Sequence, residues 1–140
     1  MVRNPIERAW SHAKKDLVRN RHRPMEEVTD EEFHRFFSNE YQRRCAAYVA
    51  QIDAWRAALS EEQVFVGRFD DIISRPEDYL LEVMRFLGIT AKRRYISGSV
   101  ADAVNATGEG PVPEGHRRFL EKLLAADIEA LRQRLGMSWD

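Results

Sequence analysis

Two guanidinium groups and a hydroxyl lie close together near the start of the chain, on Arg3, Arg8 and Ser11. Asn4 is a suitable N-cap and Pro5 suits the first position of a helix, so these residues predict a strand end, a tight turn and a helix. A helix N-terminus favours anions, and guanidinium groups make charge-assisted hydrogen bonds to them. The pattern therefore predicts convergence on one phosphate, although an ordinary capped amphipathic helix with solvated arginines would show the same residues.

Apolar residues recur at helical spacing along the same stretch and predict its buried face. They are Ile6, Ala9, Trp10, Ala13 and Leu17. Arg8, Ser11 and Lys15 recur at steps of three and four residues and lie on another face of the same helix. The basic residues from Lys14 to Arg23 are then either a solvated helix end or a rim for an anionic substrate.

The stretch Arg3-Asn4-Pro5-x-x-Arg8-x-x-Ser11 resembles the 3′-phosphate-binding motif of the sulfotransferases. These enzymes use 3′-phosphoadenosine 5′-phosphosulfate (PAPS) as the sulfuryl donor. The resemblance implies that Arg3 and Ser11 bind the 3′-phosphate of PAPS and that Arg8 has a supporting role.

A second stretch, from Val64 to Ile89, also resembles this family. Val64–Phe69 is apolar, β-branched and aromatic, which predicts a strand, and Met1–Arg3 predicts the stub of another. Asp70 and Asp71 follow the predicted strand; paired carboxylates there suit a metal or a general base, but the resemblance implies a structural role. Arg75-Pro76, a helix and Phe86-Leu87-Gly88-Ile89 complete the similarity.

Three further helices are predicted. Thr29 and Glu32 form a capping box before a short helix whose phenylalanines, Phe33, Phe36 and Phe37, are expected in the core. A long helix is expected over Tyr41–Leu59, with its apolar side chains buried; these are Tyr41, Cys45, Tyr48, Val49, Ile52, Trp55 and Leu59. The last helix, Glu114–Leu135, ends at Gly136, and its tail to Trp139 is similar to the family's C-terminus.

The segment Thr90–Gly115 is rich in glycine and proline and has no periodic pattern, which favours a functional loop. The resemblance implies that it covers the nucleotide. The Arg-Lys-Gly motif of cytosolic members is not present, so Arg93, Arg94, Asn105 and Thr107 are the candidates to replace it.

Composition indicates one domain of 140 residues with 44% hydrophobic content. The net charge of −1 gives no argument for nucleic acid or membrane binding. The only cysteine, Cys45, suits a reducing compartment, and no apolar run reaches transmembrane length. We expect a cytoplasmic protein, and the sequence leaves open an anchor or signal further upstream.

The resemblance implies an α/β fold of three layers, related to the P-loop kinases but truncated and mostly helical in these residues. Residues 1–140 are expected to be the C-terminal part of a single sulfotransferase domain, because the Gly-rich loop that binds the 5′-phosphosulfate is not found. The implied function is sulfuryl transfer from PAPS to a hydroxyl or amine, with no metal required. The catalytic base and the acceptor are not assigned, and the 140 residues alone are expected to be inactive. The alternative is a non-catalytic, mostly helical remnant that binds adenosine bisphosphate or a protein partner.

Overall fold

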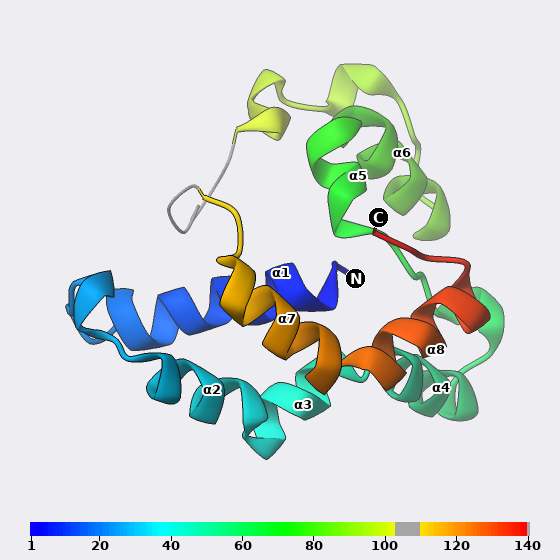
Figure 1. Cartoon of the computed structure of the whole chain (residues 1–140). Coiled ribbons are helices and arrows are strands. Elements are labelled where there is room, and N and C mark those ends of the chain that lie inside the picture. Colours follow the sequence, from blue (N-terminus) through cyan, green and yellow to red (C-terminus); the bar gives the residue numbers. More distant parts are fainter. Residues whose placement is uncertain (103–109, 140) are drawn as a thin grey trace. The chain divides into compact units, whose positions relative to one another are not determined.

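The computed structural model describes residues 1–102 and 110–139, and these residues are mainly helical (Figure 1). The chain divides into two compact units. The first comprises Met1–Arg3 and Ala54–Ala106, and the second comprises Asn4–Asp53 and Thr107–Asp140. Among the described residues, no helix has the length and apolar character that crossing a membrane requires.

The second unit is built from helices that come from both ends of its sequence. They are α1 (Pro5–Ala13), η1 (Lys14–Arg19), η2 (Met25–Glu27), α2 (Asp30–Ser38), α3 (Glu40–Ala46), the start of α4 (Tyr48–Ala58), α7 (Glu114–Leu123) and α8 (Ala125–Leu135). In η1 the backbone hydrogen bonds span five residues, as in the bond of 2.8 Å from Asn20 N–H to the Lys15 carbonyl. This π-helix prolongs α1 without a break in the chain direction.

The helix starts form as their sequence signals predict. The Asn4 side chain caps α1 by accepting from the backbone N–H groups of Ile6 and Glu7, at 2.9 and 3.4 Å. The capping box before α2 is complete: Thr29 Oγ1 accepts from the Glu32 N–H at 3.2 Å, and Glu32 Oε2 accepts from the Thr29 N–H at 3.0 Å. Both caps satisfy N–H groups that a helix otherwise leaves unpaired.

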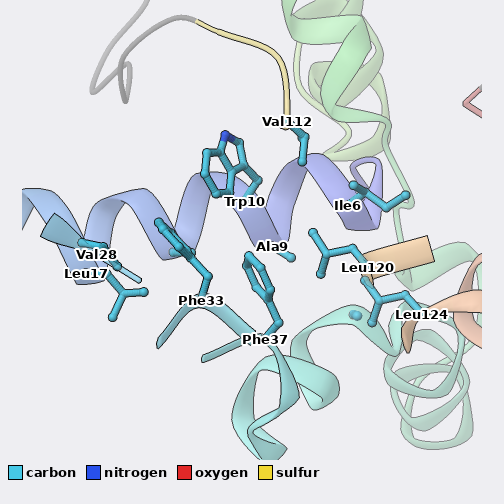
Figure 2. Close-up of a cluster of buried hydrophobic side chains, with 12 residues drawn as sticks. Ile6, Ala9, Trp10, Leu17, Val28, Phe33, Phe37, Val112, Leu120 and Leu124 are labelled. Atoms are coloured by element: carbon cyan, nitrogen blue, oxygen red, sulfur yellow. The ribbon is translucent and has the colours of Figure 1, made fainter. Parts of the chain in front are cut away.

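A single cluster of buried apolar side chains holds the second unit together (Figure 2). It confirms the predicted inner face of α1 and the burial of Phe33 and Phe37 on α2. The cluster comprises Ile6, Ala9, Trp10, Ala13, Leu17, Val28, Phe33, Phe37, Ala46, Val112, Leu120 and Leu124. Burying a Phe or Leu side chain contributes about 1.5–3 kcal/mol, so this cluster is the main source of the unit's stability.

Two of the predicted long helices are each broken in two. Ala47 has φ −75° and ψ 57°, which ends α3 and separates it from α4. Leu124, at φ −107° and ψ 10°, separates α7 from α8 in the same way. The prediction that Tyr41–Leu59 buries all its apolar side chains is wrong, because Tyr41 and Trp55 are 65% and 63% exposed. Gly136 confirms its predicted role, since it ends α8 in the left-handed region at φ 62°.

The first unit contains α5 (Phe69–Ser74), α6 (Pro76–Phe86) and three short 3₁₀ helices. The 3₁₀ helices are η3 (Glu61–Gln63), η4 (Arg93–Tyr95) and η5 (Gly98–Ala101). Gly88, with φ 69°, follows α6 in the left-handed conformation that its position predicts.

The expected strands are reduced to one parallel bridge between Val2 and Arg68, and no strand is formed within residues 1–102 and 110–139. The Val2 N–H donates to the Gly67 carbonyl at 2.8 Å, and the Phe69 N–H donates to the Val2 carbonyl at 2.7 Å. A ladder needs successive pairs, but the helix α5 already begins at Phe69. The fold class is therefore mainly helical here, and the α/β part of the prediction is present only as this bridge.

Candidate functional site

Arg3 belongs to the first unit, where its side chain is half-buried. The guanidinium carbon lies 4.6 Å from the centroid of the Phe69 ring, within the range of a cation–π contact. The preceding residue, Val2, is held by both hydrogen bonds of the parallel bridge. The backbone that carries Arg3 is thus anchored on its N-terminal side.

Arg8 lies in the second unit and joins α1 to α3. Its Nη1 donates to the Gln42 carbonyl at 3.5 Å, and its Nη2 lies 3.1 Å from Nδ1 of His12. Both partners belong to the protein itself, so these contacts hold α1 against α3. Gln42 is 34 positions away in the chain, and no sequence signal could have identified its carbonyl as the partner.

The protonation state of His12 determines whether its Nδ1 atom can accept a hydrogen bond from Arg8. Burial lowers the pKa of His12, against the opposing effect of Asp16, whose Oδ2 lies 3.4 Å from the Nε2 atom. A neutral imidazole has one donor and one acceptor nitrogen. With its proton on Nε2, the ring faces Asp16 as a donor and accepts from Arg8 at Nδ1.

Ser11 is half-buried on α1, three residues after Arg8 and in the same unit. The predicted contribution of the helix N-terminus is corrected by the structure. Pro5 has no N–H, the Ile6 and Glu7 N–H groups donate to Asn4 Oδ1, and the Arg8 N–H donates to the Asn4 carbonyl at 2.9 Å. The first turn of α1 therefore offers an anion its dipole but no unpaired N–H donor.

The paired carboxylates of α5 are engaged in ion pairs within the first unit. Asp71 Oδ2 lies 2.8 Å from Nη2 of Arg75, which also binds Glu82 on α6. Asp70 lies 3.7 Å from Nη2 of Arg68. Glu82 and Asp71 raise the pKa of Arg75. These contacts join α5 to α6 and support the structural interpretation of the acidic pair.

The candidates on the predicted nucleotide-covering loop are only partly described. Arg93 forms ion pairs with Glu77 and Asp78 on α6, and Arg94 Nη2 donates to the Tyr95 hydroxyl at 2.9 Å. Asn105 and Thr107 lie outside the described residues. The donors of Arg93 are thus directed at carboxylates of its own unit.

His116, on α7, is a buried titratable group that sequence reasoning missed. It is 7% exposed, and its ring centroid lies 4.8 Å from Phe33 and 5.2 Å from Trp10. Burial lowers the pKa of His116, and Asp30 opposes this. The signal was available, because His116 lies four residues before Leu120 on the buried face of α7.

A family model described as "Sulfotransferase domain" matches residues 1–107. The match covers Arg3, Arg8 and Ser11 and the whole stretch from Val64 to Ile89, but not the tail of the chain. No curated protein and no solved structure matches.

Proposed function

The chain belongs to the sulfotransferase domain family, and from this premise we propose that it acts in sulfuryl transfer from PAPS to a hydroxyl or amine acceptor. The observation that carries the proposal is the match over residues 1–107, which includes the motif from Arg3 to Ser11. The finer features expected of the fold, a P-loop-kinase-like α/β layering and a single domain, are part of the same proposal.

In this proposal Arg3 and Ser11 bind the 3′-phosphate of PAPS. Arg3 supplies a guanidinium that is half-buried against Phe69, and Ser11 supplies a hydroxyl on α1. A phosphate accepts charge-assisted hydrogen bonds from groups of both kinds. Because the first turn of α1 has no unpaired N–H group, side chains must supply the directed donors.

Arg8 is proposed to position α1 rather than to bind the nucleotide directly. Its guanidinium is shared between the Gln42 carbonyl and His12, and this links α1 to α3. Loss of Arg8 would therefore act on the orientation of Ser11.

The transfer itself develops negative charge on the sulfuryl and bridging oxygens, which preorganised donors at the 5′ end of the nucleotide must stabilise. A base must also reach the acceptor proton. Arg3, Arg8 and Ser11 are proposed for the 3′ end, so they position the donor and supply neither of these functions. We accordingly expect no detectable transfer by the 140 residues alone.

The proposal is tested by nucleotide binding to purified protein, with adenosine 3′,5′-bisphosphate compared with adenosine 5′-phosphate. A charge-assisted hydrogen bond contributes about 1.5–3 kcal/mol. Arg3→Ala and Ser11→Ala should therefore weaken binding of the bisphosphate by about tenfold or more and change binding of the monophosphate much less. Arg21→Ala, which removes an exposed guanidinium, is the control. Equal losses for both nucleotides would contradict the assignment.

The second candidate is a non-catalytic module that binds adenosine bisphosphate or a protein partner. Exposed apolar side chains in the first unit favour partner binding: Trp55, Ile73, Leu87, Ile89 and Tyr95 are all more than half exposed. Large exposed apolar side chains are typical of interaction sites where they form a contiguous patch. Ser11-dependent PAPS turnover, measured in a longer protein that also carries a Gly-rich loop for the 5′-phosphosulfate, would exclude this alternative.

A further inference from the structure

A hollow of about 400 Å³ lies on the second unit, apart from the phosphate motif. Its lining residues come from the end of α2, from α3 and the break that follows it, and from the first turn of α8. The lining residues are Ser38, Glu40, Arg43, Arg44, Ala47 and Asp127. None of Arg3, Arg8 and Ser11 is among them, so what the hollow binds can be tested separately from the proposed function.

The backbone around the hollow is held by specific local features. Asn39 Oδ1 accepts from the Gln42 N–H at 2.8 Å and so fixes the start of α3. The non-helical conformation of Ala47 ends α3, and that of Leu124 begins α8. The hollow thus lies beside two breaks in helices that the sequence pattern predicts to be continuous.

The charged groups of the hollow are not paired with one another. Within residues 1–102 and 110–139, the guanidinium groups of Arg43 and Arg44 form no ion pair or hydrogen bond. Asp127 is half-buried and interacts with Arg43 only through its charge. Burial raises the pKa of Asp127, while Arg43 lowers it. The guanidinium groups of Arg43 and Arg44 and the carboxylates of Glu40 and Asp127 therefore line one cavity. Of the two carboxylates, Asp127 is half-buried and Glu40 is exposed.

We propose that this hollow binds a small organic anion that also carries a hydroxyl group. The acid group of the ligand lies on Arg43 and Arg44, where guanidinium groups bind carboxylate or sulfate with good geometry. The hydroxyl donates to the Asp127 carboxylate. Ligand pockets generally have volumes of roughly 300–1,000 Å³, and this hollow falls in that range.

The proposal is tested by NMR titration of the purified chain with D-glucuronate, which has both a carboxylate and hydroxyl groups. D-glucose lacks the acid and acetate lacks the hydroxyls. Saturable shifts at the amides of α3 and the start of α8 are expected with glucuronate, which should bind at least tenfold more tightly than either comparison compound.

Variants assign the binding to the lining residues. Arg43→Gln with Arg44→Gln should weaken glucuronate binding at least tenfold, because both donors for the acid are lost. Arg19→Gln with Arg21→Gln removes the same charge from exposed positions outside the hollow and should leave binding unchanged. Asp127→Asn should retain acetate binding but abolish the preference for glucuronate. Circular dichroism checks that each variant is folded.

The outcomes separate cleanly. Saturable binding that is lost in the Arg43/Arg44 variant and retained in the Arg19/Arg21 variant supports the proposal. Absence of saturable binding, or equal weakening in both double variants, overturns it. A glucuronate preference that survives Asp127→Asn overturns the assignment of the hydroxyl contact.

Discussion

Replacement of His116 by phenylalanine should stabilise the protein and remove part of its sensitivity to acid. The His116 Nδ1 atom is buried and has no hydrogen-bond partner among the described residues. The ring lies against Trp10 and Phe33, and a phenyl ring can keep these contacts. The substitution thus removes an unsatisfied polar atom while preserving the packing of α7 on α1 and α2.

The expected magnitude follows from two contributions. A buried polar group without a partner costs about 1–3 kcal/mol. Against this, the pair between His116 Nε2 and Asp30 Oδ1, at 3.5 Å, is lost; because the Asp30 side chain is 86% exposed, this pair contributes at most about 1 kcal/mol. His116→Phe should therefore raise the free energy of unfolding by about 1 kcal/mol at pH 7.5.

The effect of pH has a definite sign. Burial lowers the pKa of His116 below its ordinary value of 6.5, so the folded protein keeps the ring neutral while the unfolded chain takes up a proton. The stability is therefore fully present above pH 6.5 and is lost as the pH falls below this value toward the folded-state pKa. His12, whose pKa is also lowered by burial, acts in the same direction.

Urea unfolding at pH 7.5 and pH 5.5 measures both effects. Tryptophan fluorescence is the readout, and Trp10, which lies beside the ring, contributes to it. The gain from His116→Phe should be larger at pH 5.5 than at pH 7.5. His22→Asn is the matched control, because His22 is exposed and has φ 50°, a conformation that asparagine tolerates. If His116→Phe and the wild type lose equal stability between the two pH values, the reasoning is refuted.

Two further predictions concern local packing and capping. Gly67→Ala should destabilise the first unit by about 1–3 kcal/mol, because the new Cβ would lie 2.8 Å from Cε2 and Cζ of Tyr79. Gly98→Ala, where nothing lies within 4 Å of the new Cβ, should be nearly neutral in the same urea titration. Equal effects of the two substitutions would contradict the steric explanation. Thr29→Ala should lower the free energy of unfolding by about 1 kcal/mol, in thermal or urea unfolding, because it removes the cap of α2. Thr90→Ala, at an exposed position, should leave the free energy of unfolding unchanged. An unchanged unfolding midpoint for Thr29→Ala would count against the capping box.

Local signals were sufficient to predict where several helices begin and end. Asn4, Thr29, Gly88 and Gly136 act through contacts within a few residues, so their effect can be inferred from the neighbouring sequence. The breaks at Ala47 and Leu124 could not be predicted in this way, because neither residue is a helix breaker. The prediction of a strand over Val64–Phe69 was wrong for a related reason. β-propensity describes a fit to neighbouring strands, and among the described residues the one pairing of this segment is the bridge between Val2 and Arg68.

The candidate site shows the same division between local and distant information. The sequence places Arg8 and Ser11 on one helix, but the Gln42 carbonyl that engages Arg8 comes from another. Arg43 and Arg44 look like ordinary basic residues in the last turn of α3, and only the three-dimensional arrangement places Asp127 beside them. The joint binding of phosphate by Arg3 and Ser11 stays a prediction.

The π-helical segment η1 has a consequence for how this chain tolerates changes in length. A turn closed over five residues holds one residue more than an α-helical turn, and two successive side chains, Leu17 and Val18, pack against the same cluster. Deletion of one residue here would leave a regular α-helix that still presents an apolar side chain at this place. A deletion within α1 would instead rotate the residues on one side of it by about 100° and remove Ile6 or Trp10 from the core. Relatives whose α1 and η1 together are one residue longer or shorter should therefore carry the insertion or deletion between Lys14 and Arg19.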